Sequence, residues 1–350
     1  MVGSHGASML ITQSYHSIFE IDPEFIPSIE QLLKEDIPNF EVLKERHEGA
    51  PETDVFTYFL FFGPTQNTPV GFAQLTLRKI PWRRYLPWWK RILFFWRRDH
   101  LHWKEAIWKV IDGSAGLYVF DPRFLKSGRE KVSELLSEYE ARSDIKARQL
   151  FCTKGWQEPK TVLDHPELKK TEYSVLEPFP RSSKTYEDYL KTLPPEVARK
   201  IKQGWKDLHD KGNIFMGDYP SADHLKKVEL PEPLRKKLIN WKAQVLTFER
   251  GHELLGCIAI LRGKEGNIFC EPFPFEPQAS ALVSDDLYIQ YGLYKFFEIP
   301  EARRCHLMKN GEKLSYHDKD DVQFILDQGF TTKTISTYFS SAIPGLESPL

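Results

Sequence analysis

The sequence has few cysteines and no long apolar run. Its four cysteines form no Cys-x-x-Cys pair and have no histidine at the spacing of a metal site. This pattern argues against a disulfide framework or a zinc module and fits a reducing compartment. The candidate membrane span, residues 92–96, is five residues long, whereas a bilayer requires about 20 apolar residues. The sequence therefore predicts a protein that is soluble or peripheral to a membrane.

The chain also has almost no net charge, with a formal value of −1. The chain has 48 Lys and Arg against 49 Asp and Glu, which argues against a general nucleic-acid binder. A hydrophobic content of 41% argues against disorder. At roughly 150 residues per domain, the length of 350 residues indicates two domains. Residues 1–8 resemble a leader added by an expression vector, so we expect the natural chain to start at Met9.

The average charge conceals one strongly basic segment. Residues 79–109 contain nine Lys or Arg, two acidic residues and six of the nine tryptophans. The seven excess positive charges of this segment leave a charge of −8 on the rest of the chain. A seven-residue repeat within it predicts a helix that starts near Trp88, because Pro87 fits a first helical turn. The repeating tryptophans are Trp82, Trp89, Trp96 and Trp103.

This aromatic-basic insertion predicts contact with an anionic membrane surface. Tryptophans beside Lys and Arg are typical of a helix that lies in the headgroup region. Two other interpretations stay open: packing of the Trp face against the protein itself or a second copy, and nucleic-acid binding, which would suit a tRNA-linked donor. We expect a cytoplasmic protein bound peripherally to the inner face of the membrane. The expected contact residues are Trp89, Lys90, Arg91, Trp96, Arg97 and Arg98.

Hydrophobic periodicity predicts a mixed α/β chain whose two halves share one order of elements. Each half contains helices, a β-hairpin, a strand, a helix and a strand, followed by an extended segment. The expected elements of the first half are 15–19, 23–35, 39–47, 54–62, 70–80, 116–120, 128–142, 148–153 and 169–180. Those of the second half are 185–211, 232–243, 244–248, 254–262, 267–271, 285–297, 305–308, 320–328 and 332–339.

This order resembles the fold of the GCN5-related N-acetyltransferases (GNAT), written twice. Residues 69–75 (PVGFAQL) and 254–260 (LLGCIAI) both resemble the third strand of that superfamily, and residues 324–330 (FILDQGF) resemble its C-terminal ending. The resemblance implies an α/β fold with a mixed sheet in each of two tandem domains, 9–182 and 183–345. The tandem arrangement with a basic helix at the start of the second copy resembles the Fem-type transferases of peptidoglycan bridges.

The resemblance also implies a phosphate-binding turn for an acyl-CoA co-substrate and no permanently bound cofactor. In this fold the donor pyrophosphate binds backbone N–H groups where a helix begins. Residues 121–131 resemble that turn, whereas the equivalent residues 276–281 contain no Lys or Arg. A solvated basic turn is the alternative interpretation. The expected phosphate contacts are Lys126, Ser127, Gly128 and Arg129.

Acyl transfer to an amine requires a proton acceptor, an acid for the leaving thiol and a donor to the carbonyl. Glu271, at the end of an apolar strand, is the candidate base. His306 and Tyr288 are candidates for proton relay, although a tyrosine at helical spacing with Tyr291 and Tyr294 or a histidine within a strand often belongs to the core. No residues form the pattern of a metal site.

Three functions follow as hypotheses from these features. The first is an acyltransferase that moves an acyl group from acyl-CoA or a similar thioester to an amine of a lipid-linked or membrane-associated acceptor. The second is a Fem-like transferase that takes an aminoacyl group from tRNA to a peptidoglycan precursor. The third is a membrane-binding module on an acyltransferase fold that has lost its catalytic activity.

Overall fold

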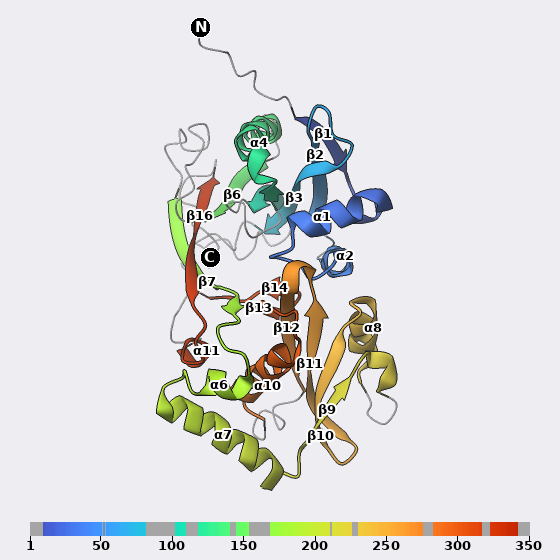
Figure 1. Ribbon diagram of the computed structural model, residues 1–350. Helices are drawn as coiled ribbons and strands as arrows, with labels where there is room; N and C mark the ends of the chain where they lie inside the picture. Colours follow the sequence, from blue (N-terminus) through green and yellow to red (C-terminus); the bar gives the residue numbers. More distant parts are fainter. Residues whose placement is uncertain are drawn as a thin grey trace, which may run out of the picture. The chain divides into compact units, whose positions relative to one another are not determined.

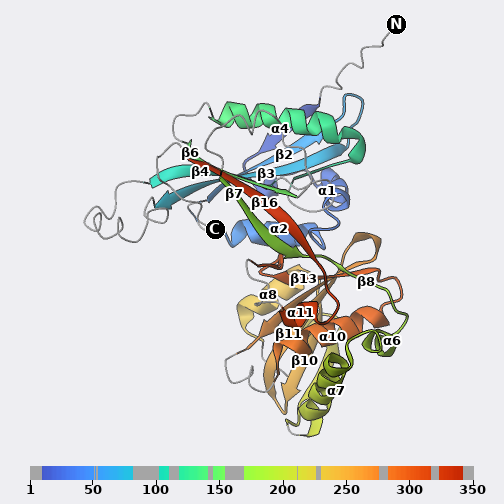
Figure 2. The same ribbon diagram turned by 90° about the vertical axis from the view of Figure 1, so that its left-hand side faces the viewer.

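The computed structural model consists of two compact units (Figures 1 and 2). Unit 1 comprises residues 1–35, 47–173 and 334–350, and unit 2 comprises residues 36–46 and 174–333. Three segments thus differ from an expected division at residue 182, because 36–46 and 174–182 are grouped with unit 2 and 334–350 with unit 1. The structure describes residues 10–50, 52, 54–81, 102–109, 118–140, 145–153, 169–210, 212–225, 230–275, 283–316 and 323–341.

Unit 1 contains most strands of the larger of the two sheets, whereas β15 and the end of β7 fall within the residues of unit 2. The strand order of this sheet is β1-β2-β3-β4-β6-β16-β7-β15, and β5 pairs with β3. Neighbours from β1 to β4 are antiparallel, and β4 and β6 are parallel. The strands are β1 (Ile11–Tyr15), β2 (Asp54–Phe62), β3 (Pro69–Pro81), β4 (His102–Lys109), β5 (Tyr118–Phe120), β6 (Ile145–Thr153), β7 (Lys169–Leu176), β15 (Ser315–Tyr316) and β16 (Thr332–Ser341).

Helices flank this sheet, and α4 runs along one face of it in Figure 2. Apolar side chains of the hairpin β2–β3 form much of the core, among them Phe61 and Phe72 at 0% exposure. The last strand of the chain, β16, is antiparallel to β6. The helical segments of the first half are η1 (Ile18–Glu20), η2 (Pro23–Phe25), α1 (Ile26–Leu32), α2 (Phe40–Glu48), η4 (Pro122–Phe124) and α4 (Leu125–Glu140).

Unit 2 has a sheet in the order β14-β13-β12-β11-β10-β9, with β8 paired to β13. Neighbours from β9 to β12 are antiparallel, and β12 and β13 are parallel. These strands are β8 (Phe179–Pro180), β9 (Phe215–Tyr219), β10 (Gln244–Arg250), β11 (Glu253–Arg262), β12 (Asn267–Pro274), β13 (Arg304–Lys309) and β14 (Glu312–Lys313).

Helices cover both faces of this second sheet, as Figures 1 and 2 show for α8 and α10. One buried cluster contains apolar residues of α6, α7, α10 and α11, and the other contains residues of α8 together with Val42 from α2. The helical segments are α6 (Tyr186–Leu190), α7 (Pro195–Asp210), η5 (Ala222–His224), α8 (Glu232–Asn240), η6 (Lys264–Gly266), α10 (Asp285–Glu298) and α11 (Gln323–Leu326).

The structure differs from the expected elements in several places. The single helix predicted over 185–211 is two helices, α6 and α7, because Pro194 disfavours a helical residue before it and Pro195 begins a new helix. The strand predicted over 15–19 ends at Tyr15, because Ser17 and Glu20 form a capping box that starts a 3-10 turn. The edge strand β9 was not expected from its sequence at all.

The helix predicted for the aromatic-basic insertion is wrong at the C-terminal end of that segment. Residues 102–109 form strand β4, which pairs antiparallel with β3 from Leu75 to Pro81. The tryptophan at the end of the seven-residue repeat, Trp103, therefore lies in extended backbone, and its conformation is determined by pairing with β3. The residues expected to contact a membrane lie outside the described residues: Trp89, Lys90, Arg91, Trp96, Arg97 and Arg98.

The strand order confirms the expected fold class. In each sheet, four successive antiparallel strands are followed by a fifth strand that is parallel to the fourth. A helix precedes this fifth strand in the chain: α4 precedes β6, and α10 precedes β13. A parallel neighbour needs such a crossover, which distinguishes this arrangement from a plain meander. The chain thus contains the GNAT arrangement twice, as an α/β fold with two mixed sheets.

Candidate functional site

The strand-to-helix turn of unit 1 is built around the ring of Phe120. Gly71 of β3 lies opposite Phe120 of β5, and a Cβ atom at Gly71 would lie 2.2 Å from the ring. A Cβ atom at Gly128 of α4 would lie 2.5 Å from the same ring. Phe120 is 1% exposed and also packs on Phe61, with ring centroids 4.8 Å apart. Both glycines therefore allow a strand and a helix to approach this aromatic side chain closely.

Asp121 organises the turn that follows Phe120. Its carboxylate accepts a hydrogen bond from the backbone N–H of Arg123 at 3.0 Å, which caps the short helix η4. The guanidinium of Arg123 donates to both carboxylate oxygens, at 3.0 and 2.8 Å. This hydrogen bonding lowers the pKa of the Asp121 carboxyl, so its charge is kept in the turn. The charge of Arg123 is therefore already matched within the turn itself.

The four residues expected to contact phosphate lie at the start of α4. The helix begins at Leu125, so Lys126, Ser127 and Gly128 belong to its first turn, and no acidic residue lies in that turn. Lys126 is exposed, Ser127 is half-buried, and Gly128 is buried against Phe120. Arg129 follows in the helix, and its side chain lies outside the description. Of the four, Lys126 is the described cation that faces solvent.

The equivalent helix of unit 2 begins with the opposite charge. The N-cap of α10, Ser284, forms no capping bond through its side chain, and Asp285 and Asp286 occupy the first turn. Carboxylates at this position stabilise the positive end of the helix dipole. Asp286 also forms an ion pair with Lys200 of α7 at 2.7 Å. A surface pocket of about 450 Å³ opens between α7 and this end of α10.

Glu271, the candidate base, is buried where the pairing of β12 with β13 ends. That parallel pairing runs from Asn267 to Cys270, and Glu271 is the next residue of β12. Its carboxylate accepts a hydrogen bond from the backbone N–H of Gly311 at 2.8 Å, and the residue is 1% exposed. Burial raises the pKa of Glu271, while the hydrogen bond from Gly311 and the charge of Lys237 oppose the shift. Glu271 thus connects β12 to the turn between β13 and β14.

His306 lies on the same face of the sheet as Glu271. Its ring stacks on Phe269 with centroids 4.4 Å apart, and its Nε2 atom is 2.9 Å from the Oδ1 atom of Asn267. Because alternate residues of a strand share a face, Asn267, Phe269 and Glu271 follow one another on this side of β12. His306 is 2% exposed and is fixed by these two neighbours.

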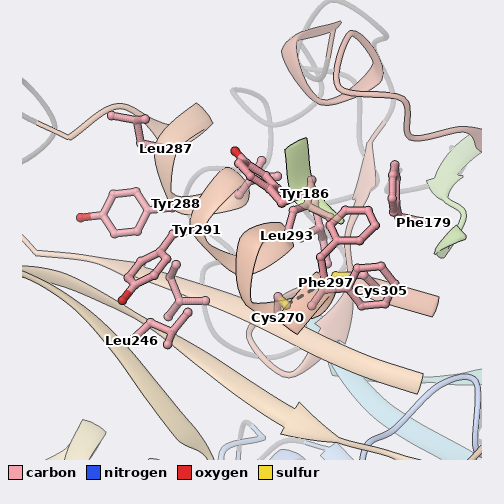
Figure 3. Close-up of a cluster of buried hydrophobic side chains, with 14 of the residues drawn as sticks. Phe179, Tyr186, Leu246, Cys270, Leu287, Tyr288, Tyr291, Leu293, Phe297 and Cys305 are labelled. Atoms are coloured by element: carbon pink, nitrogen blue, oxygen red, sulfur yellow. Dashed lines mark hydrogen bonds between the residues drawn. The ribbon is translucent and has the colours of Figure 1, made fainter. Parts of the chain in front are cut away.

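Tyr288 lies on the opposite face, in the buried cluster drawn in Figure 3. Its hydroxyl donates to the carbonyl of Leu255 at 3.2 Å, and burial raises its pKa. A Cβ atom at Gly256 would lie 2.0 Å from that hydroxyl oxygen. The next tyrosine of α10, Tyr291, donates to the carbonyl of Gly217 at 2.9 Å. The structure therefore brings Glu271 and His306 to one face of the sheet and Tyr288 to the other.

Sequence reasoning missed a set of charged and aromatic side chains around the Gly311 turn. Arg46 donates to the carbonyl of Gly311, and Lys237 lies 3.3 Å from the carboxylate of Glu45. The ammonium group of Lys237 also lies over the ring of Trp241, 4.4 Å from its centroid. These residues come from α2, α8 and the β13–β14 turn, so they are far apart in the chain. No sequence signal indicates contacts at such separations.

The described part of the chain contains neither a metal-binding cluster nor a membrane-spanning helix. There, no group of three His, Cys, Asp or Glu side chains is arranged to hold a metal ion. Among the helices of these same residues, none is long and apolar enough to cross a bilayer. The three cysteines whose side chains are described, Cys257, Cys270 and Cys305, are free and buried. The sulfur atoms of Cys270 and Cys305 lie 3.5 Å apart in the core (Figure 3).

No protein-family model matches the chain, and no curated protein matches it. Among solved structures, it is similar to a tandem GNAT protein from the clavulanic acid biosynthesis pathway, with 10% identity, coverage of 96% of this chain and 99% of that chain, and a TM-score of 0.44. L-PGS from Bacillus licheniformis is similar with 7% identity, 92% coverage of each chain and a TM-score of 0.47. At such identities the likeness concerns the backbone alone, and the fold assignment rests on the strand order described above.

Proposed function

We propose that the chain is an acyltransferase of the GNAT fold whose donor is an acyl-CoA or a similar thioester, bound at the start of α4 in unit 1. The acceptor in this proposal is an amine of a lipid-linked or membrane-associated molecule. The observation that carries the donor assignment is the contrast between the two helices that occupy equivalent places in the two sheets. The first turn of α4 contains Lys126 and no acid, whereas the first turn of α10 contains Asp285 and Asp286.

This contrast favours anion binding in unit 1. The dipole of a helix places a positive potential at its first turn, which favours an anion there. A pyrophosphate at the start of α4 would meet this potential together with the ammonium of Lys126. At α10 it would meet two carboxylates. The negative charges of these carboxylates would repel the phosphates of the donor, so we assign the donor to unit 1.

The thioester carbonyl also needs a hydrogen-bond donor when the amine attacks. Among the described strands, β5 pairs with β3 alone, whereas β4 pairs with both β3 and β6. The second edge of β5 therefore has no strand partner in this part of the sheet. Its backbone N–H groups are suited to polarise a carbonyl and to stabilise the oxyanion of the tetrahedral intermediate. The amine nitrogen then forms the new amide bond, and the CoA sulfur leaves as the thiol.

Within unit 2, Glu271 is proposed as a base and His306 as a proton relay, because both lie on one face of the sheet, whereas Tyr288 lies on the other face and is assigned to the core. The burial of Glu271 supports this role, because it raises the carboxyl pKa toward the range in which a base accepts a proton readily. Turnover measurements separate this role from a purely structural one. A Glu271→Gln variant that binds CoA normally but has a reduced kcat supports proton transfer, whereas unchanged turnover assigns Glu271 to the Gly311 turn alone.

Calorimetric titration with CoA, acetyl-CoA and a long-chain acyl-CoA tests the donor assignment. We expect Lys126→Glu to weaken binding about 5- to 30-fold, which corresponds to about 1–2 kcal/mol at a helix terminus. The control is Lys236→Glu, which reverses the charge of an exposed lysine on α8. Binding that is equal in both variants refutes the site, and no binding of any CoA compound up to 1 mM refutes the donor class.

The membrane-associated acceptor is proposed from the aromatic-basic insertion, whose composition is typical of a headgroup-binding segment. Sedimentation with vesicles that contain phosphatidylglycerol tests this assignment. We expect a variant with Trp89→Ala, Trp96→Ala, Arg97→Glu and Arg98→Glu to lose binding to these vesicles. Equal binding by this variant removes the insertion from the proposed membrane contact.

A further inference from the structure

The exposed side of α7 carries a row of cations, which we call the basic stripe: Arg199, Lys202 and Lys206. Their spacing of three and four residues places them along one side of the helix. All three side chains are exposed, and within the described part of the chain none forms an ion pair with an acidic residue. Three uncompensated positive charges therefore lie along about two turns of helix.

The acidic residues of α7 lie beside this stripe rather than within it. Glu196 and Asp207 line the pocket between α7 and α10, and Lys200 on that same side is paired with Asp286. Asp210, the last residue of the helix, lies 3.4 Å from the ring of His209. Arg199 also lines the pocket, so it lies where the stripe meets the mixed-charge side, and Lys202 and Lys206 continue the stripe away from the pocket.

The basic stripe leads to an exposed apolar tip formed by Phe215 and Met216, the first residues of β9. Phe215 is 59% exposed and Met216 is 51% exposed. The ring of His209 at the end of α7 lies 6.3 Å from that of Phe215, which joins the tip to the helix. Because successive residues of a strand point to opposite faces, both sides of this strand end present an apolar side chain to solvent.

Such a tip is unusual on the edge of a sheet. β9 is the last strand in the order of the second sheet and pairs with β10 alone among the described strands. Edge strands in soluble proteins are commonly protected by charged residues or proline. Here the first two residues of the strand are a phenylalanine and a methionine. Exposed apolar side chains next to cations are typical of a surface that enters the headgroup region of a bilayer.

We propose that the basic stripe and the Phe215–Met216 tip form a surface of unit 2 that binds an anionic lipid bilayer. The cations meet the phosphate groups, and the two apolar side chains enter the interface below them. Three cations are few for a nucleic-acid groove, and methionine offers no ring for a base to stack on. This inference deepens the proposed function and rests on its membrane-associated acceptor, since it gives the membrane a contact on the second unit.

Vesicle binding by the full chain tests the proposal, with phosphatidylcholine vesicles that contain 0% or 30% phosphatidylglycerol as probes. We expect a stripe variant with three Lys or Arg to Glu changes to bind the anionic vesicles at least tenfold more weakly. A tip variant, Phe215→Ser with Met216→Ser, should lose affinity that high salt does not remove. The matched control reverses three exposed lysines elsewhere on unit 2: Lys184, Lys236 and Lys309.

The outcomes separate this surface from the rest of the proposed function. If the control variant loses as much vesicle binding as the stripe variant, the effect is one of net charge alone and the proposal is wrong. The proposal is also wrong if the stripe variant and the tip variant both bind the anionic vesicles as well as the wild type. If the stripe variant loses affinity for a short RNA but not for vesicles, the surface binds nucleic acid and the proposal is wrong. CoA titration of the same preparations tests the donor assignment separately. If the wild-type chain does not bind CoA, the donor assignment is refuted, whereas the proposed lipid-binding surface is not affected by that result.

Discussion

Replacement of Glu271 tests whether a buried carboxylate holds the turn at Gly311 in unit 2. The carboxylate accepts the Gly311 N–H at 2.8 Å, and both residues are buried. Glu271→Ala removes the acceptor and leaves a buried N–H without a partner, which costs about 1–3 kcal/mol of the free energy of unfolding. Glu271→Gln keeps an acceptor oxygen at nearly the same place and removes only the ionisation. The two variants therefore separate the hydrogen bond from the charge.

The effect of the charge depends on pH with a defined sign. Burial raises the pKa of Glu271 in the folded chain above its value when unfolded, which is about 4.3. The folded protein therefore takes up a proton more readily than the unfolded chain, and ionisation of Glu271 lowers the free energy of unfolding. This loss is absent below about pH 4.3, grows as the pH rises through the folded pKa, and is complete above it. Glu271→Gln should gain stability relative to the wild type over that window.

Urea unfolding at pH values from about 4.5 to 8 measures this difference. We expect the free energy of unfolding of Glu271→Gln, minus that of the wild type, to increase with pH. The control is Glu253→Gln, which removes the charge of an exposed carboxylate and leaves the buried site intact. A Glu271→Gln difference that stays constant across the range refutes the raised pKa. An unchanged stability of Glu271→Ala refutes the hydrogen bond as an anchor of the turn.

Two further changes test the packing of each unit by thermal unfolding. Gly71→Ala places a Cβ atom 2.2 Å from the Phe120 ring and should cost about 1–3 kcal/mol; an unchanged melting temperature contradicts the close approach. Arg181→Ala removes guanidinium bonds to the carbonyls of Phe297 and Ile299 at the end of α10 and should cost about 1–3 kcal/mol. Arg181→Lys should recover part of this loss, since it restores a cation at the helix C-terminus. A lysine variant no better than alanine assigns the effect to the guanidinium hydrogen bonds and not to the charge.

The repeated fold was predictable because its signals are local. Apolar runs interrupted by Gly, Pro and Asn predicted the hairpin of β2 and β3, and the same pattern predicted β10 and β11. The alignment of Gly71 with Gly256 has a steric basis in both units. Gly71 leaves room for Phe120 of the next strand, and Gly256 leaves room for Tyr288 of α10. The repeat in sequence is therefore also a repeat in packing, although a different element supplies the aromatic ring.

Contacts across the chain were not predictable from the sequence. A strand over 332–339 was expected, but periodicity does not specify a partner, and the pairing of β16 with β6 depends on the whole sheet. The packing of residues 36–46 with unit 2 likewise depends on Arg46, Val42 and Glu45 meeting residues that lie about 190 or more positions later. The division of residues 186–210 into two helices could have been predicted, because Pro194 and Pro195 are a local signal for a break. The continuous apolar stripe across this segment favoured a single helix instead.

The two copies keep the same steric features and differ in charge where a phosphorylated donor would bind. A steric requirement such as a glycine beneath an aromatic ring follows from the fold and so recurs in each copy. A helix that begins with two aspartates gains stability from its own dipole, which is an adequate arrangement for a helix with no ligand to bind. The first turn of α4 contains no acid, and the carboxylate of Asp121 that precedes it is paired with Arg123. An anion supplied by the donor would meet no unpaired carboxylate there, so the charge difference between α4 and α10 supports the proposed division of roles between the two units.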